Sequence, residues 1–228
     1  MTLRRVISGY TIERIIRDGT GKAYEGDTAE MVQRGSDGIS IGIVSDAEPL
    51  VRLFERIAAE QGWQPDGQIR AYPDQSVCFA AEVEGILAGG LQLVVGSPAG
   101  TLPCLTAWPE LSLSGRTDVA DVALIAFLPQ YRGKDTLFWK LLVEAWRYCD
   151  RAGILELWME VTPRTFRLYC RLGWPLETMG PLRPHWGEDC WPCRVGVLAL
   201  EELFAKKAMR STFYQDLFAQ ARREDSGE

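Results

Sequence analysis

Residues 119 to 146 read VADVALIAFLPQYRGKDTLFWKLLVEAW, which predicts a strand, a turn and a helix in succession. The apolar, β-branched run ends at Leu128, Pro129 and a short polar turn follow, and helical spacing starts at about Lys134. A buried strand that feeds a helix through a short turn collects unpaired backbone N–H groups at the positive end of the helix dipole. We therefore predict a phosphate-binding site at this turn.

The chain is large enough for one sizeable core. It has 228 residues, of which 46% are hydrophobic. We expect a central domain over residues 38 to 200, after an extension of residues 1 to 37 with a short helix and a linker. A terminal helix and tail, residues 201 to 228, follow it. No apolar run has the roughly 20 residues of a membrane span, and the first residues contain no apolar signal region, so we expect a cytoplasmic location.

Charge and composition narrow the classes of partner. The net charge of −6 argues against nucleic acid or an anionic membrane as the main partner, and an acidic carrier protein would need a local basic patch. Six cysteines without a secretory signal indicate reduced, mostly buried thiols. Eight tryptophans fit a large apolar pocket or a tryptophan-rich core equally well.

Hydrophobic periodicity predicts the order β, α, β, β, β, α, β, α, β, α. The ranges are strand 39–44, helix 48–61, strands 77–83 and 86–95, strand 118–128, helix 134–151, strand 154–161, helix 163–171, strand 195–200 and helix 201–222. Two residues, Glu84 and Gly85, separate the strands of the expected hairpin. Gly89 and Gly90 suggest a bulge or a close backbone approach. The order favours an α/β (α+β) protein whose mixed sheet carries helices on both faces.

Two motifs resemble the GNAT acyltransferase superfamily. Gln130, Gly133 and the following helix start match its Q/R-x-x-G-x-G/A loop, which cradles coenzyme A or a phosphopantetheine arm, with Asp135 at the last small-residue position. The segment LYCRLGW, residues 168 to 174, resembles the Y-x-x-x-G-F/W segment about 40 residues later. The resemblance implies a mostly antiparallel sheet with one splayed pair of parallel strands.

A narrower resemblance is to the acyl-homoserine-lactone synthases and the long-chain N-acyl amino acid synthases. It rests on EQGW at 60–63, YPDQSVCFAAEVEG at 72–85, GGLQLV at 89–94, LPCLTAWPEL at 102–111, LPQYRG at 128–133 and LGWPLETMGP at 172–181. Where the lactone synthases carry E-x-S-R, this chain has Asp121-Val-Ala-Leu124, and Gln92 stands where they often have arginine. The loss of these polar contacts argues against homoserine lactone as the acceptor and leaves another amine open.

The resemblance implies an N-acyltransferase with an acyl carrier protein or acyl-CoA as donor, a small acceptor such as an amino acid, and no metal. An acetyl-CoA-dependent N-acetyltransferase is one alternative. A non-catalytic module that binds an acyl ligand is another, and Leu124 and Asp135 are the residues that favour it.

The expected site residues follow from the same resemblance. Tyr169 would protonate the departing thiolate, unless it is a core tyrosine. Asp121 would accept the proton of the amine, unless it only makes an ordinary polar contact. The expected donor-binding residues are Ile125 and Phe127, through backbone N–H groups, and Gln130, Arg132, Gly133, Lys134, Asp135 and Thr136 at the turn. The expected substrate pocket contains Trp63, Trp108, Leu124 and Trp158.

Cys190 and Cys193 have the C-x-x-C spacing of redox dithiols and zinc sites. A strand-like run follows instead of a helix, and a second C-x-x-C is absent, so only His185 with both cysteines would remain as metal ligands. Since His185 is the only histidine, a Ser-His-Asp or Cys-His mechanism would need it as the base. Its Pro-rich loop beside Trp186 favours a pocket wall or a surface role.

Overall fold

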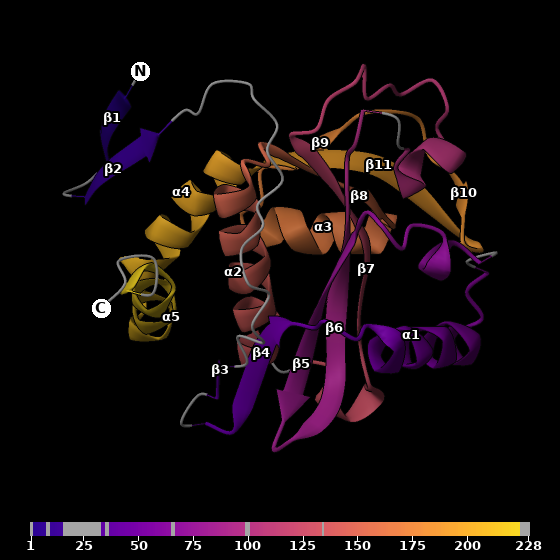
Figure 1. The fold of residues 1–228 in the computed structure, drawn as a ribbon, viewed down its shortest axis with the longest axis horizontal. Helices are drawn as coiled ribbons and strands as arrows, with labels where there is room; N and C mark the ends of the chain where they lie inside the picture. The colour runs from indigo at the N-terminus through magenta and orange to yellow at the C-terminus, as the bar shows by residue number, and fades with distance from the viewer. Residues whose placement is uncertain are drawn as a thin grey trace.

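The computed structural model describes residues 2–7, 10–15, 33–34, 37–64, 67–98, 101–133 and 135–223, with side chains for 37–64, 67–98, 101–133 and 136–219 (Figure 1). Within this part of the chain, nine strands form one sheet in the order β10-β11-β8-β7-β6-β5-β4-β3, and β9 pairs with β11. Its strands are β3 (Gln33–Arg34), β4 (Ile39–Ile43), β5 (Ser76–Val83), β6 (Ile86–Val95), β7 (Val119–Phe127), β8 (Glu156–Val161), β9 (Glu177–Thr178), β10 (Arg183–His185) and β11 (Glu188–Gly196). Strands β1 (Thr2–Ile7) and β2 (Tyr10–Ile15) form a separate antiparallel hairpin.

The sheet is antiparallel except where β7 lies beside β8. These two strands run parallel and pair over three residues only, from Val119↔Glu156 to Asp121↔Trp158. Both strands continue beyond the last pair without further pairing to each other, so they part there. The expected mostly antiparallel sheet with one splayed parallel pair is confirmed.

Helices cover both faces of the sheet, as predicted (Figure 1). The α2 face carries α2 (Asp135–Ala152), α4 (Val197–Ala208) and α5 (Thr212–Arg223), which share one large apolar core with the sheet. The α1 face carries α1 (Glu48–Gln61) and the short helices η1 (Gln68–Arg70) and η2 (Pro103–Thr106). Helix α3 (Pro163–Arg171) packs against β8 and β11.

A β-bulge in β7 sets which side chains face which layer. Gln92 of β6 is opposite Leu124, but the next residue, Leu93, is opposite Val122, so Ala123 is the extra residue. Ala123 and Leu124 therefore both contact the α1 face, while Val122 and Ile125 both contact the α2 face. The bulge lies just beyond the point where β7 leaves β8.

The glycine predictions are confirmed. Glu84 (φ 54°) and Gly85 (φ 78°) are both left-handed, as the two-residue hairpin turn between β5 and β6 requires. A Cβ on Gly89 would collide with the backbone of Ala126, and one on Gly90 with the backbone of Phe79. These glycines let the three central strands approach closely.

Several sequence-based boundaries were wrong. The expected helix near Ile12 and Ile15 is strand β2. The expected strand 195–200 ends at Gly196, where α4 begins, because Val197, Leu200 and Phe204 are buried at helical spacing. The expected single terminal helix is divided, since α4 ends at Ala208 and α5 starts at Thr212. The passage between α3 and Cys190, for which no regular element was predicted, contains β9 and β10.

In the described part of the chain, no helix combines the length and apolarity that a bilayer crossing would need.

Candidate active site

The site is organised around the point where β7 and β8 part. Asp121 and Trp158 are the last paired residues, and beyond them the two strands no longer hydrogen bond to each other. Side chains beyond this point lie on the two faces of the opening. One face holds a narrow apolar cavity, and the other holds a cluster of buried polar groups.

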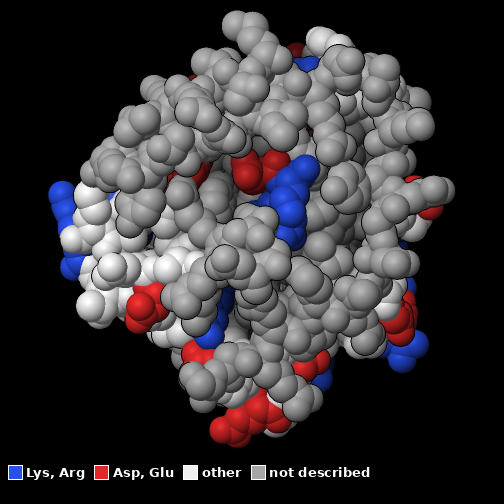
Figure 2. Space-filling model, turned by 60° about the vertical axis from the view of Figure 1, so that its left-hand side comes forward, with Lys and Arg blue, Asp and Glu red and all other residues white. Residues whose placement is uncertain are grey.

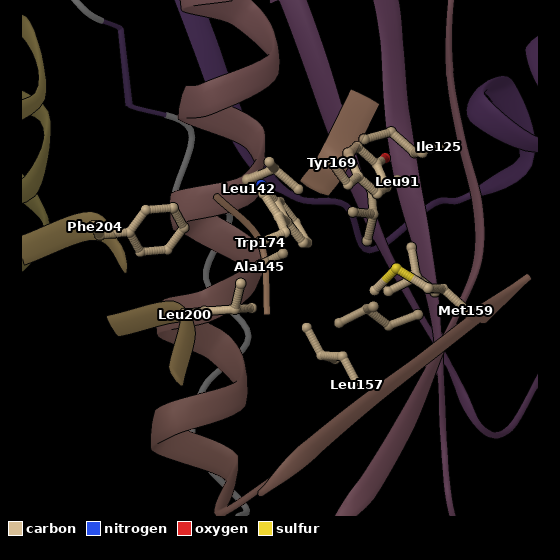
Figure 3. Close-up of a pocket in the computed structure, with 12 residues that line it drawn as sticks. Leu91, Ile125, Leu142, Ala145, Leu157, Met159, Tyr169, Trp174, Leu200 and Phe204 are labelled. Carbon is tan, nitrogen blue, oxygen red and sulfur yellow. The ribbon is translucent and has the colours of Figure 1, made fainter. Parts of the chain in front are cut away.

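The cavity lies on the α2 face and is almost wholly apolar (Figure 3). The volume open to the centre of a water molecule is about 20 Å³, enough for roughly one water. Its lining residues come from β6, β7, β8, α2, α3, α4 and the segment after α3: Leu91, Leu93, Val122, Ile125, Leu142, Ala145, Leu157, Met159, Tyr169, Trp174, Leu200 and Phe204.

Tyr169 brings a hydroxyl group to this apolar cavity. Helix α3 holds it there: Thr162 caps the helix by accepting a hydrogen bond from Thr165 N (3.2 Å), and Pro163 occupies the first turn. The ring stacks on Trp174, with 4.7 Å between ring centroids. Burial raises the pKa of Tyr169 to about 12, so the phenol stays protonated at neutral pH and can donate a proton.

The turn after β7 has the features expected of an anion site. A short helix, η3 (Pro129–Tyr131), follows the strand, and Arg132 donates its Nε–H to the carbonyl oxygen of Phe127 (2.9 Å). Gly133 is left-handed (φ 77°), and a Cβ there would meet nothing within 4 Å. Helix α2 begins at Asp135, so its unpaired N–H groups face this turn.

The predicted donor residues lie along this path. Ile125 lines the cavity, and Phe127 is half-buried at the end of β7. Gln130 and Arg132 are exposed in the turn, and Thr136 is half-buried in the first turn of α2. Lys134 and the side chain of Asp135 lie outside the described residues.

Helix α3 also presents a basic surface. Arg164, Arg167 and Arg171 are exposed, and none of them forms an ion pair with a described residue. A surface hollow of about 320 Å³ is lined by Phe166, Arg167, Cys170 and Arg171. Helix α3 lies close to the start of α2, because Phe138 in the first turns of α2 stacks with Tyr169 of α3 (6.4 Å between ring centroids). On the face shown in Figure 2, by contrast, the described basic and acidic side chains are intermixed.

The α1 face of the opening holds Cys104, Asp121 and Glu160. Their ligand atoms lie within 4.8 Å of one another, the spacing of groups that could hold one cation, and Asp121 and Glu160 hydrogen bond to each other when one of them is protonated. Asp121 is 0% exposed, and its Oδ2 accepts a hydrogen bond from Cys104 N (3.0 Å). Burial raises the pKa of Asp121 to about 6 and that of Glu160 well above its ordinary value.

Sequence reasoning singled out Asp121 but missed Cys104 and Glu160. The sequence shows only that Glu160 alternates with apolar residues along its strand, whereas in the structure that face of β8 is buried beneath η2 and Trp108. One signal that could have identified Glu160 is its position in β8. It lies two residues beyond Trp158, on the same face of the sheet as Asp121 in the neighbouring strand.

None of the four predicted substrate residues lines the cavity. Trp108 and Trp158 are buried in the same cluster as Cys104, and their indole N–H groups donate to Pro181 O (2.8 Å) and Glu156 Oε2 (3.1 Å). Trp63 and Leu124 pack against α1. All four belong to the α1 face.

Cys190 and Cys193 lie in β11, in cores on opposite faces of the sheet. Residues three apart on a strand point in opposite directions, so these thiols do not form a dithiol or a shared metal site. His185 lies between Trp108 and Trp186, and burial lowers its pKa to about 4. The imidazole is therefore neutral at neutral pH.

No family model and no curated protein sequence matches the chain. Solved structures do match, and they show that the chain has the fold of GNAT-like acyl-transferring enzymes.

One similar structure is FeeM, an N-acyl amino acid synthase from uncultured soil microbes (TM-score 0.59, 17% identity, 73% of this chain and 93% of that one). Another is the acyl-homoserine-lactone synthase LasI (TM-score 0.53, 16% identity, 70% and 89%). A third is BjaI, a CoA-dependent acyl-homoserine lactone synthase with SAM and isopentyl-CoA (TM-score 0.51, 16% identity, 68% and 75%).

Proposed function

We propose that this protein is an N-acyltransferase that moves an acyl group from a pantetheine thioester to the amine of a small acceptor such as an amino acid. The supporting observation is the arrangement along β7: the strand edge near Ile125 and Phe127 is not paired with β8, Ile125 lines the apolar cavity together with Tyr169, and the turn at Gly133 follows the strand. A phosphate-bearing pantetheine arm and an acyl chain need these two environments in this order. The fold shared with acyl synthases agrees with this proposal.

The reaction requires a neutral amine, a polarised thioester carbonyl and a proton for the leaving sulfur. In the proposed mechanism, backbone N–H groups of β7 near Ile125 and Phe127 polarise the carbonyl. Asp121 takes a proton from the acceptor ammonium, the nitrogen attacks the carbonyl carbon, and the C–S bond breaks. Tyr169 protonates the thiolate, and the nitrogen loses its second proton, which passes through water to restore Tyr169. Asp121 and Tyr169 lie on opposite faces of the sheet. In the proposed mechanism the amine and the thiolate lie on opposite sides of the acyl carbon, so each meets one of these two side chains.

The donor is coenzyme A or the phosphopantetheine arm of an acyl carrier protein. Both place phosphate at the start of α2, where the helix dipole and Arg132 favour an anion. The arginines of α3 form a basic surface near that turn on a chain of net charge −6. An acidic carrier protein would use such a surface, whereas free coenzyme A would need only part of it.

The narrow cavity favours a second candidate within the same chemistry, transfer of acetyl or another short acyl group. A space of about 20 Å³ does not hold a long chain unless the lining side chains move. Met159 is a flexible lining residue that can make room. A comparison of acetyl- to hexadecanoyl-CoA as donors decides between the two candidates.

For the acceptor, the structure agrees with the argument against homoserine lactone. Leu124 is 7% exposed and packs against α1, so it offers no polar contact to an acceptor. Gln92 is also buried, and its Nε2–H groups donate to Ile69 O (3.1 Å) and Ser76 Oγ (2.9 Å). We therefore propose an amine recognised by other groups on the α1 face.

The donor site can be tested by Gly133→Glu with Gly153→Glu as its matched control. Both glycines are left-handed and open, at the two ends of α2, so both substitutions carry the same backbone strain of about 1–2 kcal/mol. Only Gly133→Glu adds a negative charge and bulk at the donor phosphates. We expect it to abolish binding of acyl-CoA in calorimetry, while Gly153→Glu binds like the unmodified protein.

The enzymatic activity itself can be tested by mass spectrometry of the products formed from acyl-CoAs, or an acyl carrier protein, and an amine mixture. A new acylated amine is the expected result. If no donor binds and no acylated amine forms, the proposed function is wrong. If a donor binds without turnover, the non-catalytic alternative is the better description.

A further inference from the structure

Two buried carboxyl groups meet at the point where β7 and β8 part. Asp121 is the last residue of β7 that pairs with β8, and Glu160 lies two residues beyond the corresponding position, on the same face of β8. The carboxyl groups therefore span the beginning of the opening from its two sides. Their oxygen atoms are within 4.8 Å of each other and of Cys104 Sγ.

Each carboxyl group has an oxygen atom without a donor. Oδ1 of Asp121 and Oε1 of Glu160 are buried and have no hydrogen-bond partner. A buried unpaired acceptor is costly, and two buried carboxylates side by side repel each other as well. One proton held between the groups would supply a donor and remove one of the two charges.

The surroundings favour a proton over a cation. The titratable groups that face the pair are Cys104 from η2, Tyr72 before β5, and Cys190 from β11. None of these is a base that would neutralise a second negative charge. Burial also keeps the Cys104 thiol protonated, because it raises the pKa of that group far above its ordinary value. The Cys104 N–H group already occupies Asp121 Oδ2.

We propose that Asp121 and Glu160 form a carboxylic acid–carboxylate pair that holds one proton between them and accepts the proton of the acceptor amine. The catalytic part of this proposal rests on the proposed function. In each turnover the ammonium transfers one proton to the pair, which becomes neutral, and the neutral amine attacks the thioester. The pair returns the proton to water after the amide and the thiol have left. Glu160 acts through Asp121 and is a positioning residue.

Infrared titration tests the pair without any need for activity. We expect one protonated carboxyl group at pH 7 in the unmodified protein, absent from both Asp121→Asn and Glu160→Gln. The matched control is Glu156→Gln on the same face of β8, whose carboxylate pairs with Arg116 (3.2 Å). It should keep the signal. No protonated carboxyl at pH 7, or one present in both variants, overturns the proposal. A stoichiometric metal in the purified protein that Glu160→Gln removes overturns it too.

The catalytic part is tested by the pH dependence of kcat/KM. We expect Glu160→Gln to move the acidic limb to higher pH by roughly one unit, because an amide donates a weaker hydrogen bond to the Asp121 carboxylate than the carboxylic acid that it replaces. Glu156→Gln should leave the limb in place, and Asp121→Asn should lose activity at least about 100-fold. An unchanged limb in Glu160→Gln overturns the catalytic role while the infrared result stands. A protein with the infrared signal but without any acyl transfer contradicts the proposed function and leaves the pair intact.

Discussion

At the residue scale, Tyr169 brings a hydroxyl group to a cavity whose packing requires only apolar contacts. Tyr169 is 8% exposed, and its ring already has Trp174 and Phe138 as aromatic neighbours. A phenylalanine would make the same ring contacts. The hydroxyl is therefore the part of Tyr169 that a purely structural role leaves unexplained.

We expect Tyr169→Phe to lower kcat by about 100-fold or more, because the leaving thiolate loses its proton donor. The KM for the donor and the thermal stability should change little, since the ring remains. Steady-state kinetics and thermal unfolding measure both effects. Tyr148→Phe is the control, because this half-buried tyrosine packs on Phe79 and does not line the cavity. Equal kcat in the two variants would remove Tyr169 from the mechanism.

At the element scale, the bulge in β7 frees backbone groups at the site without disturbing the core. Because Ala123 and Leu124 both face α1, removing Ala123 would restore regular alternation and leave every other side chain of β7 on its present face. The ladder between β6 and β7 would become continuous. The bulge is therefore a local feature of β7 that the packing of the fold does not require.

We accordingly expect deletion of Ala123 to give a folded protein with a near-unchanged circular dichroism spectrum and an activity at least about 100-fold lower. The loss would come from the changed direction of the backbone N–H groups near Ile125. Ala123→Gly is the control, because it removes one methyl group and leaves the bulge in place. A fully active Ala123 deletion would show that the bulge has no part in acyl transfer.

The elements also show what the sequence alone can predict. Helix 48–61 and the two-residue turn at Glu84 were predicted with the observed bounds, because amphipathic spacing and turn residues are local signals. The burial of Glu160 in β8, by contrast, could not be predicted from local signals. Glu160 alternates with apolar residues as a surface residue would, and only the pairing of β8 beside β7 and the cover from η2 bury it.

At the scale of the whole molecule, the buried ionisable groups should determine how stability depends on pH. The raised pKa values of Asp121 and Glu160 mean that the folded state holds protons the unfolded chain has released, so these groups lower stability as pH rises. His185 has the opposite effect. Its pKa is lowered from 6.5 to about 4, so it lowers stability as pH falls below 6.5.

The two effects oppose each other only below pH 6.5, because His185 is neutral in both states above it. We expect the free energy of unfolding to fall from pH 6.5 to 8 in the unmodified protein, and to fall less in Glu160→Gln. In His185→Phe the decline should begin at lower pH and be roughly 1.5 kcal/mol larger between pH 4.5 and 6, because His185 takes up most of one proton on unfolding over this interval. Urea unfolding followed by tryptophan fluorescence measures all three curves. A rise in stability from pH 6.5 to 8, or identical curves for His185→Phe and the unmodified protein, would contradict this assignment of the buried charges.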